Sequence, residues 1–254
     1  MILDLQKANM WKRISAYLFD TILLGIAAVG LAFLLSNILG YDYYSNKLNE
    51  AYQKYALEYG VDFEISAADY ELLSDEEIRL YDDAIKAMNK DSEVTYVYTM
   101  VINLTVLMVT FGILFAYLLF EFTVPLMLKN GQTLGKKIFG IGIMRTDGIK
   151  ITPMFLFIRT VLGKYAIETM VPVMIILMIY LRLIGILGIG VIAILGVIQV
   201  VLLIATKTNS PIHDKLASTV TVDISSQMIF DTQEELLEYK KKLHTQQVTN
   251  TDYA

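Results

Sequence analysis

The feature that most constrains this chain is a series of apolar runs long enough to cross a bilayer. The first run covers Ile14 to Leu39, the second Thr95 to Leu128, and almost continuous apolar sequence extends from Thr169 to Thr206. A helix needs about 20 apolar residues to span the hydrocarbon core. Charged residues make up only 19% of the chain and the mean hydropathy is +0.51. We therefore predict an all-α integral membrane protein whose immediate partner is the lipid bilayer.

The number of transmembrane helices depends on how the last apolar stretch is divided. It is about twice as long as one span requires, and Arg182 and three glycines lie near its middle. We divide it there, into a third helix over Tyr165–Leu181 and a fourth over Leu187–Ala205. The first run is too long for a signal-peptide core and is interpreted as a retained span. About four spans result, and three spans with a re-entrant segment remain the alternative.

Charge distribution predicts the topology. The insert from 41 to 94 carries fourteen acidic and five basic residues, whereas the segment from 129 to 164 and the amino terminus are basic. The positive-inside rule places basic loops in the cytoplasm. The predicted organisation is therefore a cytoplasmic amino terminus and first span over 1–40, an extracytoplasmic insert over 41–94, a second span over 95–128, a cytoplasmic loop over 129–164, two spans over 165–206 and a cytoplasmic carboxyl segment over 207–254.

Local patterns add detail outside the spans. Ser74 and Glu77 form a capping-box pattern, so the acidic insert is expected to be a small helical cap. Alternating residues on either side of Asp147-Gly148 predict a cytoplasmic β-hairpin over 140–152, to which Ser218–Asp223 could add a third strand. Residues 153–164 are apolar but contain Arg159 and Lys164. An interfacial helix is favoured there, and a spanning one stays open. A helix is expected over 231–243.

Several classes of chemistry are excluded. The chain has no cysteine, and His213 and His244 are too few and too separated for a zinc cluster, so no metal site and no cofactor are expected. The segment around Gly131, Gly135 and Lys136 departs from the phosphate-loop spacing and lacks the Ser or Thr after its lysine. It is interpreted as a turn that presents lysines to lipid headgroups. We predict neither an enzyme nor a nucleic-acid-binding protein.

Charged residues inside or beside the spans are the candidate site. Asp20 lies in the first run, and Arg13, seven residues earlier, shares its helical face about 10 Å away along the axis. Counted from the inner end of the second run, Glu121 lies at a similar depth. We therefore expect Asp20 and Glu121 to meet and to share a proton or a cation, with Arg13, Arg159 and Asp214 at the cytoplasmic mouth.

These residues also carry a family resemblance. Arg13, Ala16 and Asp20, the segment containing Gly131, Thr133, Gly135 and Lys136, and Asp214 before an alternating β-branched stretch resemble the RDD family of bacterial membrane proteins. Its arginine and two aspartates map onto Arg13, Asp20 and Asp214. The resemblance covers roughly 10–40 and 95–225, and leaves out the acidic insert and the tail. It implies a protein of the bacterial plasma membrane, for which transport has been suggested.

Three functional interpretations follow. The charges could form a proton-coupled path for a small solute or cation, in which Asp20 is the principal carboxylate, Glu121 its partner and Asp214 a gate or anchor. They could equally be an ion-pair network that fixes helix packing without transport. In a third interpretation the protein is an accessory or scaffold that binds a partner through its insert and tail. A carrier of four short spans is expected to form a homo-oligomer or to work with a membrane partner protein.

Overall fold

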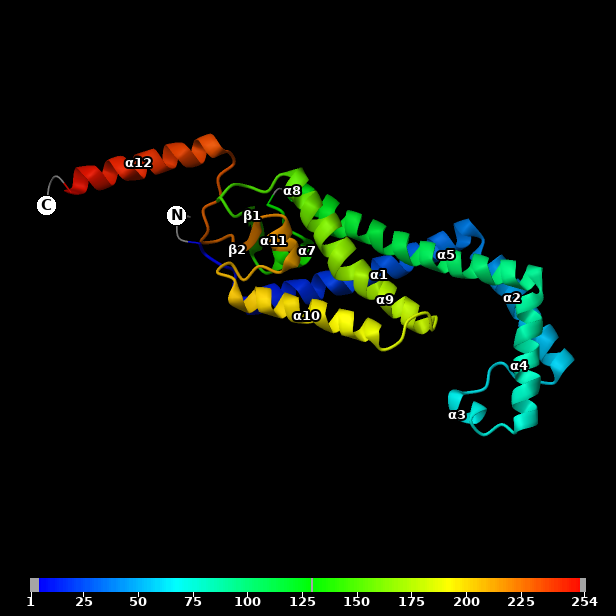
Figure 1. Cartoon of the computed structure of the whole chain (residues 1–254). Helices are drawn as coiled ribbons and strands as arrows, with labels where there is room; N and C mark the ends of the chain where they lie inside the picture. The colour runs from blue at the N-terminus through cyan, green and yellow to red at the C-terminus, as the bar shows by residue number, and fades with distance from the viewer. Residues whose placement is uncertain (1–4, 129, 252–254) are drawn as a thin grey trace. The chain divides into compact units, whose positions relative to one another are not determined.

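The computed structural model describes residues 5–128 and 130–251 and divides into two compact units (Figure 1). Unit 1 comprises Met1–Ala28 and Ile113–Ala254, and unit 2 comprises Val29–Gly112. Helices α1 (Met10–Leu39) and α5 (Ser92–Tyr117) each contribute residues to both units. Every residue of the candidate site belongs to unit 1.

Four helical stretches among the described residues are long and apolar enough to cross a membrane: Met10–Leu39, Ser92–Met127, Pro153–Tyr180 and Leu187–Ala205. Three of them have bounds close to the predicted ones. The third begins twelve residues earlier than predicted, at Pro153 instead of Tyr165, because α8 (Pro153–Phe157), η2 (Ile158–Met170) and α9 (Val171–Tyr180) follow one another without a break. We expected an interfacial helix to end at Lys164 and a spanning helix to begin after it. The structure instead has one continuous helical stretch through Lys164.

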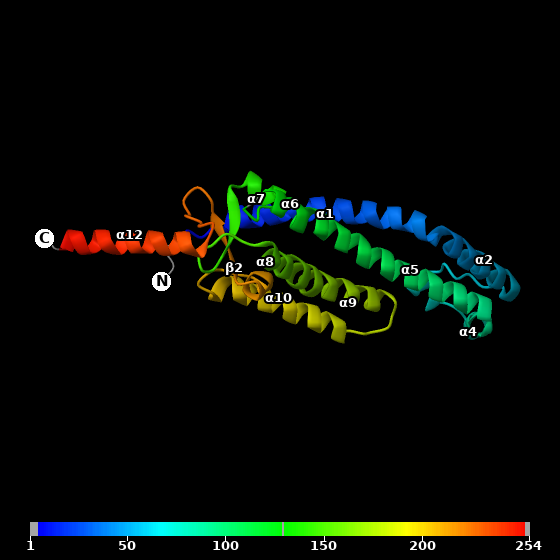
Figure 2. The same cartoon turned by 90° about the horizontal axis from the view of Figure 1, so that it is seen from above.

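Two of these helices change from α- to π-helical geometry where they approach the site. Helix α5 continues into η1 (Leu118–Thr123) and then α6 (Val124–Met127), and η2 is also π-helical. Such segments are rare and are often found at functional sites. Within unit 1, α9 and α10 (Leu187–Ala205) lie side by side and are joined by a short turn (Figure 2), in which Arg182 has a positive φ of 55°.

The sheet differs from the predicted hairpin. β1 (Ile141–Arg145) pairs antiparallel with β2 (Thr219–Asp223), with Ile143 opposite Thr221. The turn after β1 does form, because the N–H of Gly148 donates to the carbonyl of Arg145 at 3.0 Å. The returning arm makes only isolated bridges, from Lys150 to Met144 and from Ile149 to Phe230. The stretch expected as an optional third strand is thus the principal partner of β1.

The amino-terminal segment lies against the other side of β2. Lys7 forms a bridge with Val222, and the N–H of Ala8 donates to the carbonyl of Thr221 at 3.3 Å. Met144 of β1 and Val220 and Val222 of β2 are fully buried and form one apolar cluster. Two short helices flank the sheet, α7 (Leu134–Ile138) before β1 and α11 (Ile212–Leu216) before β2. The sheet therefore places these two helices beside the ends of the long ones.

Unit 2 contains the helical insert. α2 (Tyr41–Tyr59) packs on α4 (Asp75–Lys90), and the short α3 (Ala67–Tyr70) lies between them in sequence. The predicted capping box is present, since Ser74 accepts from the N–H of Glu77 and the Glu77 carboxylate accepts from the N–H of Ser74. Tyr55, Met88 and Val94 form its buried core. The insert is thus a small helical structure with its own core, as expected.

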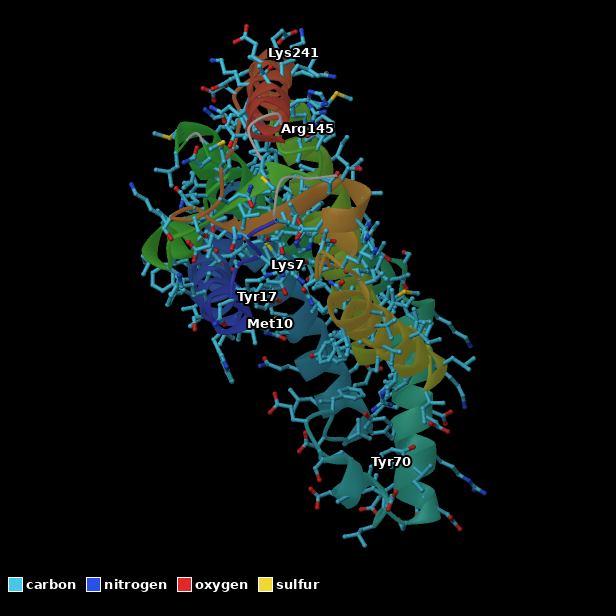
Figure 3. The ribbon with its side chains drawn as sticks, turned by 90° about the vertical axis from the view of Figure 1, so that its left-hand side faces the viewer. Lys7, Met10, Tyr17, Tyr70, Arg145 and Lys241 are labelled. Carbon is cyan, nitrogen blue, oxygen red and sulfur yellow. The ribbon has the colours of Figure 1, made fainter. Side chains whose placement is uncertain are left out.

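The carboxyl-terminal helix α12 (Gln233–Thr251) is longer than predicted. Leu236 is buried against Phe230 and Ile149, so the start of the helix is attached to unit 1. Beyond that point its lysines are exposed, as Figure 3 shows for Lys241.

Candidate functional site: a buried charge network

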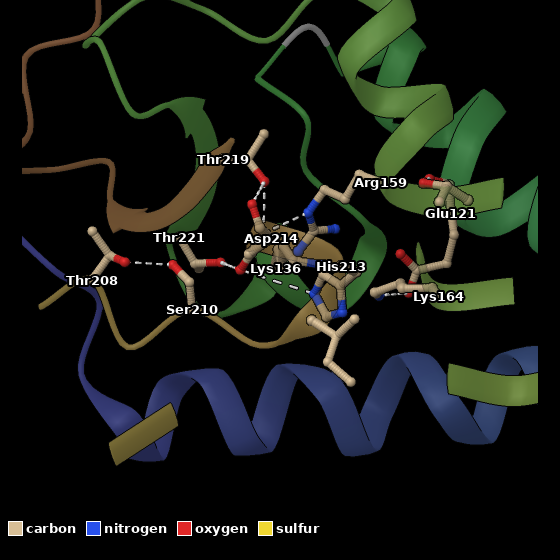
Figure 4. Close-up of polar contacts among 12 residues, drawn as sticks. Glu121, Lys136, Arg159, Lys164, Thr208, Ser210, His213, Asp214, Thr219 and Thr221 are labelled. Carbon is tan, nitrogen blue, oxygen red and sulfur yellow. Dashed lines mark hydrogen bonds and ion pairs between the residues drawn. The ribbon is translucent and has the colours of Figure 1, made fainter. Parts of the chain in front are cut away.

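Asp214 at the start of α11 is the most completely enclosed acid of the site. Only 1% of its surface is exposed, and its carboxylate accepts from Nε of Arg159 and from the hydroxyl of Thr219, both at 2.8 Å (Figure 4). A guanidinium nitrogen of Arg13 lies 3.8 Å from its second oxygen. Burial by itself would raise the pKa of Asp214, but the Arg159 charge and these hydrogen bonds outweigh it and hold the pKa well below its ordinary value.

His213, the neighbour of Asp214, connects α11 to η2. Its Nδ1 lies 2.7 Å from an oxygen of Glu168, which also accepts from the backbone N–H of His213 at 2.9 Å. Burial and the Arg159 charge lower the pKa of His213 below its ordinary value. The two helices approach so closely that a Cβ on Gly163 would lie 2.6 Å from the Cβ of His213. A glycine at this position therefore permits the contact.

Asp20 is held by the loop motif that follows the second span. Its carboxylate accepts from the hydroxyl of Thr133 and, at 2.8 Å, from the backbone N–H of Gly135. Thr133 also caps α7 by accepting from the N–H of Lys136. The Lys136 ammonium lies 3.9 Å from Asp20 and donates to Thr133 at 3.2 Å. Gly131, with a φ of 60°, forms the turn before α7.

Glu121 in η1 pairs with η2. The ammonium of Lys164 donates to its Oε1 at 2.6 Å, and the hydroxyl of Thr160 donates to its backbone carbonyl at 2.9 Å. Arg159 and Lys164 are five residues apart, which is the hydrogen-bond spacing of a π-helix, and both are buried. Within the described part of the chain, two buried polar side-chain atoms have no hydrogen-bond partner, Oε2 of Glu121 and Nη1 of Arg159.

The structure brings all the predicted charged residues into unit 1 but pairs them differently. No hydrogen bond or ion pair joins Asp20 to Glu121 among the described residues. The expected pair of carboxylates is therefore corrected to two separate acids, each with its own lysine. Both arginines, Arg13 and Arg159, pair with Asp214. The loop motif, expected to present lysines to headgroups, instead has Lys136 buried with 7% exposure, and only its neighbour Lys137 is exposed.

Sequence reasoning missed three members of the network. From the sequence, Lys164 is expected at a membrane surface, Glu168 belongs to no recognisable motif, and His213 is of interest only as a metal ligand. The pairing of Lys164 with Glu121 could have been inferred. A buried acid in a span requires a cation, and Lys164 is a cation within an apolar stretch. His213 and Glu168 are distant in sequence and carry no comparable signal.

The network is electrically balanced. Four carboxylates and four cationic side chains from five elements take part, and His213 is an additional titratable group. The carboxylates are those of Asp20, Glu121, Glu168 and Asp214, and the cations are Arg13, Lys136, Arg159 and Lys164. A cavity of about 190 Å³ is lined by residues of unit 2, including Lys54 and Tyr55. No residue of the charge network is among those that line this cavity. No group of three or more His, Cys, Asp or Glu side chains arranged to hold a metal occurs among the described residues.

Four apolar helices with buried charges between them define a multi-pass membrane protein. Residues 7–218 match the model of the RDD family, which covers most of the chain, and the protein therefore belongs to the RDD family. The match includes every member of the network and the insert, but not α12. No curated protein and no solved structure matches the chain.

Proposed function

We propose that this protein exchanges protons for a small cation or solute across the bacterial plasma membrane, by way of the buried charge network. The observation that carries the proposal is that this network places titratable groups inside a bundle of apolar helices. Charged groups there are costly, and they commonly mark ion or proton pathways.

Two features favour a working site over a purely structural one. Ion pairs that only fix packing are most stable when every polar atom is satisfied. Here Oε2 of Glu121 and Nη1 of Arg159 are buried and have no hydrogen-bond partner among the described residues. In addition, Glu121 and Lys164 both lie on π-helical segments, a geometry enriched at functional sites. Both features lie on the two helices that Thr160 connects.

The proposed orientation follows the charge distribution. With the basic loop 129–164 and both termini in the cytoplasm, α7, α11 and the sheet cover the inner ends of the helices. Asp20, Glu121 and Asp214 would then stand at the cytoplasmic end of the path, and the acidic insert would face outside. An exchanger of this size is proposed to act as a homo-oligomer or with a membrane partner protein, and no enzymatic step is involved.

Flux measurements test the proposal. Purified wild type and Asp20→Asn are reconstituted in vesicles that contain a trapped pH dye, and Na⁺, K⁺, Li⁺ or small solutes are added outside. A solute-dependent pH change in the wild type that disappears in Asp20→Asn supports exchange through this site. An equal flux in the correctly folded variant contradicts the role of Asp20. Asp231→Asn, which removes an exposed acid that is 75% accessible, is the matched control.

An accessory role is the second candidate, and an observation on unit 2 favours it. Leu57 and Leu72 of the insert are 86% and 83% exposed in an otherwise acidic segment. Exposed apolar side chains mark a contact site where they form one contiguous patch. Deletion of Tyr44–Asp91 distinguishes the two candidates. Under this proposal the deletion removes function while the helices of unit 1 stay folded, whereas intact flux after the deletion assigns the activity to unit 1 alone.

A further inference from the structure

The cavity of about 190 Å³ in unit 2 is lined by one face of α2 and by the first turns of α5. Its apolar wall consists of Ala51 from α2 and of Val94 and Val97 from α5, and both valines are buried. Clefts that hold drug-sized ligands measure about 300–1,000 Å³. This cavity is smaller, and its size therefore suits a metabolite with a short apolar side chain.

One part of the cavity wall is fixed by hydrogen bonds. The hydroxyl of Tyr55 donates to Oδ2 of Asp91 at 3.0 Å, and Oδ1 of Asp91 accepts from the backbone N–H groups of Glu93 and Val94 at 2.9 and 3.3 Å. Asp91 thus satisfies free N–H groups at the start of α5. Tyr55 is 8% exposed and packs against Val94. Because both oxygens of Asp91 are already occupied, this acid is not available to a ligand.

Two of the charged side chains that line the cavity have no charged partner. Lys47 donates to Glu93 at 3.4 Å, so these two residues form an ion pair. Glu50 makes neither a hydrogen bond nor an ion pair with any described residue. Lys54 likewise makes neither within the described part of the chain, and its ammonium lies 5.3 Å from the centroid of the Tyr55 ring. One carboxylate and one ammonium of the cavity are therefore available to a ligand.

The positions of Glu50 and Lys54 make a simple ion an unsuitable ligand. The two residues lie four positions apart on α2, which separates them by about 6 Å along the helix axis. An acid and a base this close together cancel each other's attraction for a lone anion or cation. Beside the apolar wall they are complementary to a molecule that carries an ammonium group, a carboxylate and a small apolar group.

We propose that this cavity binds a small aliphatic α-amino acid. The ammonium group of the ligand donates to Glu50, and its carboxylate accepts from Lys54. Its side chain lies against Ala51, Val94 and Val97. The inference goes beyond the proposed exchange of protons for a cation or solute, because no residue of the charge network lines the cavity.

Calorimetric titration of the detergent-purified full chain tests the inference, with L-alanine, L-valine and L-leucine as ligands. Isobutylamine and 3-methylbutanoate, which are valine without its carboxylate and without its amino group, are the comparison ligands. Each comparison ligand leaves one charged side chain of the cavity unpaired, and should bind about tenfold or more weakly than valine. Absence of binding by all three amino acids overturns the inference. Binding of either comparison ligand as tightly as valine overturns it as well.

Variants place the ligand in the cavity. Glu50→Gln and Lys54→Met each remove one charged contact and should weaken valine binding about tenfold or more. Ala51→Leu fills the cavity and should abolish binding. Glu76→Gln and Lys86→Met remove charges from α4 that do not line the cavity, and should bind valine like the wild type. Wild-type affinity in both Glu50→Gln and Lys54→Met overturns the inference, and these two exposed positions decide the matter if Ala51→Leu does not fold.

The results for the cavity are separate from those for the charge network. Cation flux in vesicles together with no amino-acid binding overturns the inference and leaves the proposed exchanger intact. Amino-acid binding that responds to Glu50→Gln and Lys54→Met, in a protein without cation flux, supports the cavity site and counts against the exchanger.

Discussion

Asp20 accepts a hydrogen bond of 2.8 Å from the backbone N–H of Gly135, which follows it by 115 residues. The contact requires a residue without a side chain, because a Cβ on Gly135 would lie 2.5 Å from the carbonyl oxygen of Ala16 and 2.9 Å from Oδ1 of Asp20. The loop motif after the second span is thus a docking element, whose backbone and hydroxyl groups bind an acid in the first span.

Gly135→Ala should therefore destabilise the protein. The added methyl group meets backbone atoms that cannot move easily, at a cost of about 1–3 kcal/mol. Thermal unfolding in detergent measures this effect as a lower midpoint. The control is Gly196→Ala in α10, where a Cβ would have no neighbour within 4 Å, and which should leave the midpoint unchanged or raise it slightly. Equal midpoints for the two variants would refute the docking role.

Asp214→Asn should be among the most destabilising single changes in unit 1. It leaves Arg159, which is 2% exposed, without its charged partner, and breaking a buried pair costs about 3–5 kcal/mol. The surface pair of Lys150 and Asp231 provides the comparison, and Asp231→Asn should cost less than about 1 kcal/mol. Denaturant titration of both variants measures the difference. A small effect of Asp214→Asn would mean that water enters the network freely.

Stability should fall as the pH is lowered through the ordinary pKa of histidine. Burial and the Arg159 charge lower the pKa of His213 in the folded protein, whereas the unfolded chain takes up a proton near 6.5. Below that pH the unfolded state binds more protons, so the free energy of unfolding decreases. His213→Asn removes this contribution. Comparison of unfolding midpoints at about pH 7.5 and 5.5 should show a smaller decrease in the variant than in the wild type. Equal decreases would exclude His213 as the cause.

Variants of the Glu121–Lys164 ion pair test whether the pair serves helix packing or transport. Lys164→Met leaves a buried carboxylate unpaired and should be strongly destabilising. The double variant Glu121→Gln and Lys164→Met removes both charges and should recover most of the lost stability, because neutral side chains carry little desolvation cost. Flux in vesicles should remain absent in the folded double variant. If flux returns together with stability, the pair only holds the helices in place.

The membrane-spanning helices could be predicted from the sequence, but the pairing of the charged residues could not. Long apolar runs fix helices locally, so α1 and α10 begin and end close to their predicted bounds. The capping box at Ser74 is likewise a short-range signal, and it was confirmed. Arg13, Asp20, Glu121, Arg159 and Asp214 could be named because charges in apolar segments are conspicuous. Their meeting in one unit follows from the need to neutralise each of them.

Which charges pair was beyond such reasoning. Counting residues along the apolar runs predicts a similar depth for Asp20 and Glu121. Which side chains pair also depends on the rotation of each helix about its axis and on which loops fold back. Asp20 is satisfied by a loop 113 residues later, through the Thr133 hydroxyl. The π-helical geometry of η2, which places Arg159 and Lys164 one turn apart, has no sequence signature. The β1–β2 pairing was underestimated because a local Asp-Gly turn signal favoured the hairpin arm.

The long separation between Asp20 and its loop partners has a consequence for biosynthesis. Thr133 emerges from the ribosome 113 residues after Asp20, which at about 5–20 residues per second takes roughly 5–25 s. During this interval the newly made α1 contains an acid without these partners, and the cost of an acid in a span reaches about 2.5–3.5 kcal/mol at the bilayer centre. A nascent chain that stalls before the second span is complete therefore holds its first helix weakly. Completion of the loop supplies the Thr133 and Gly135 donors and so secures the first helix.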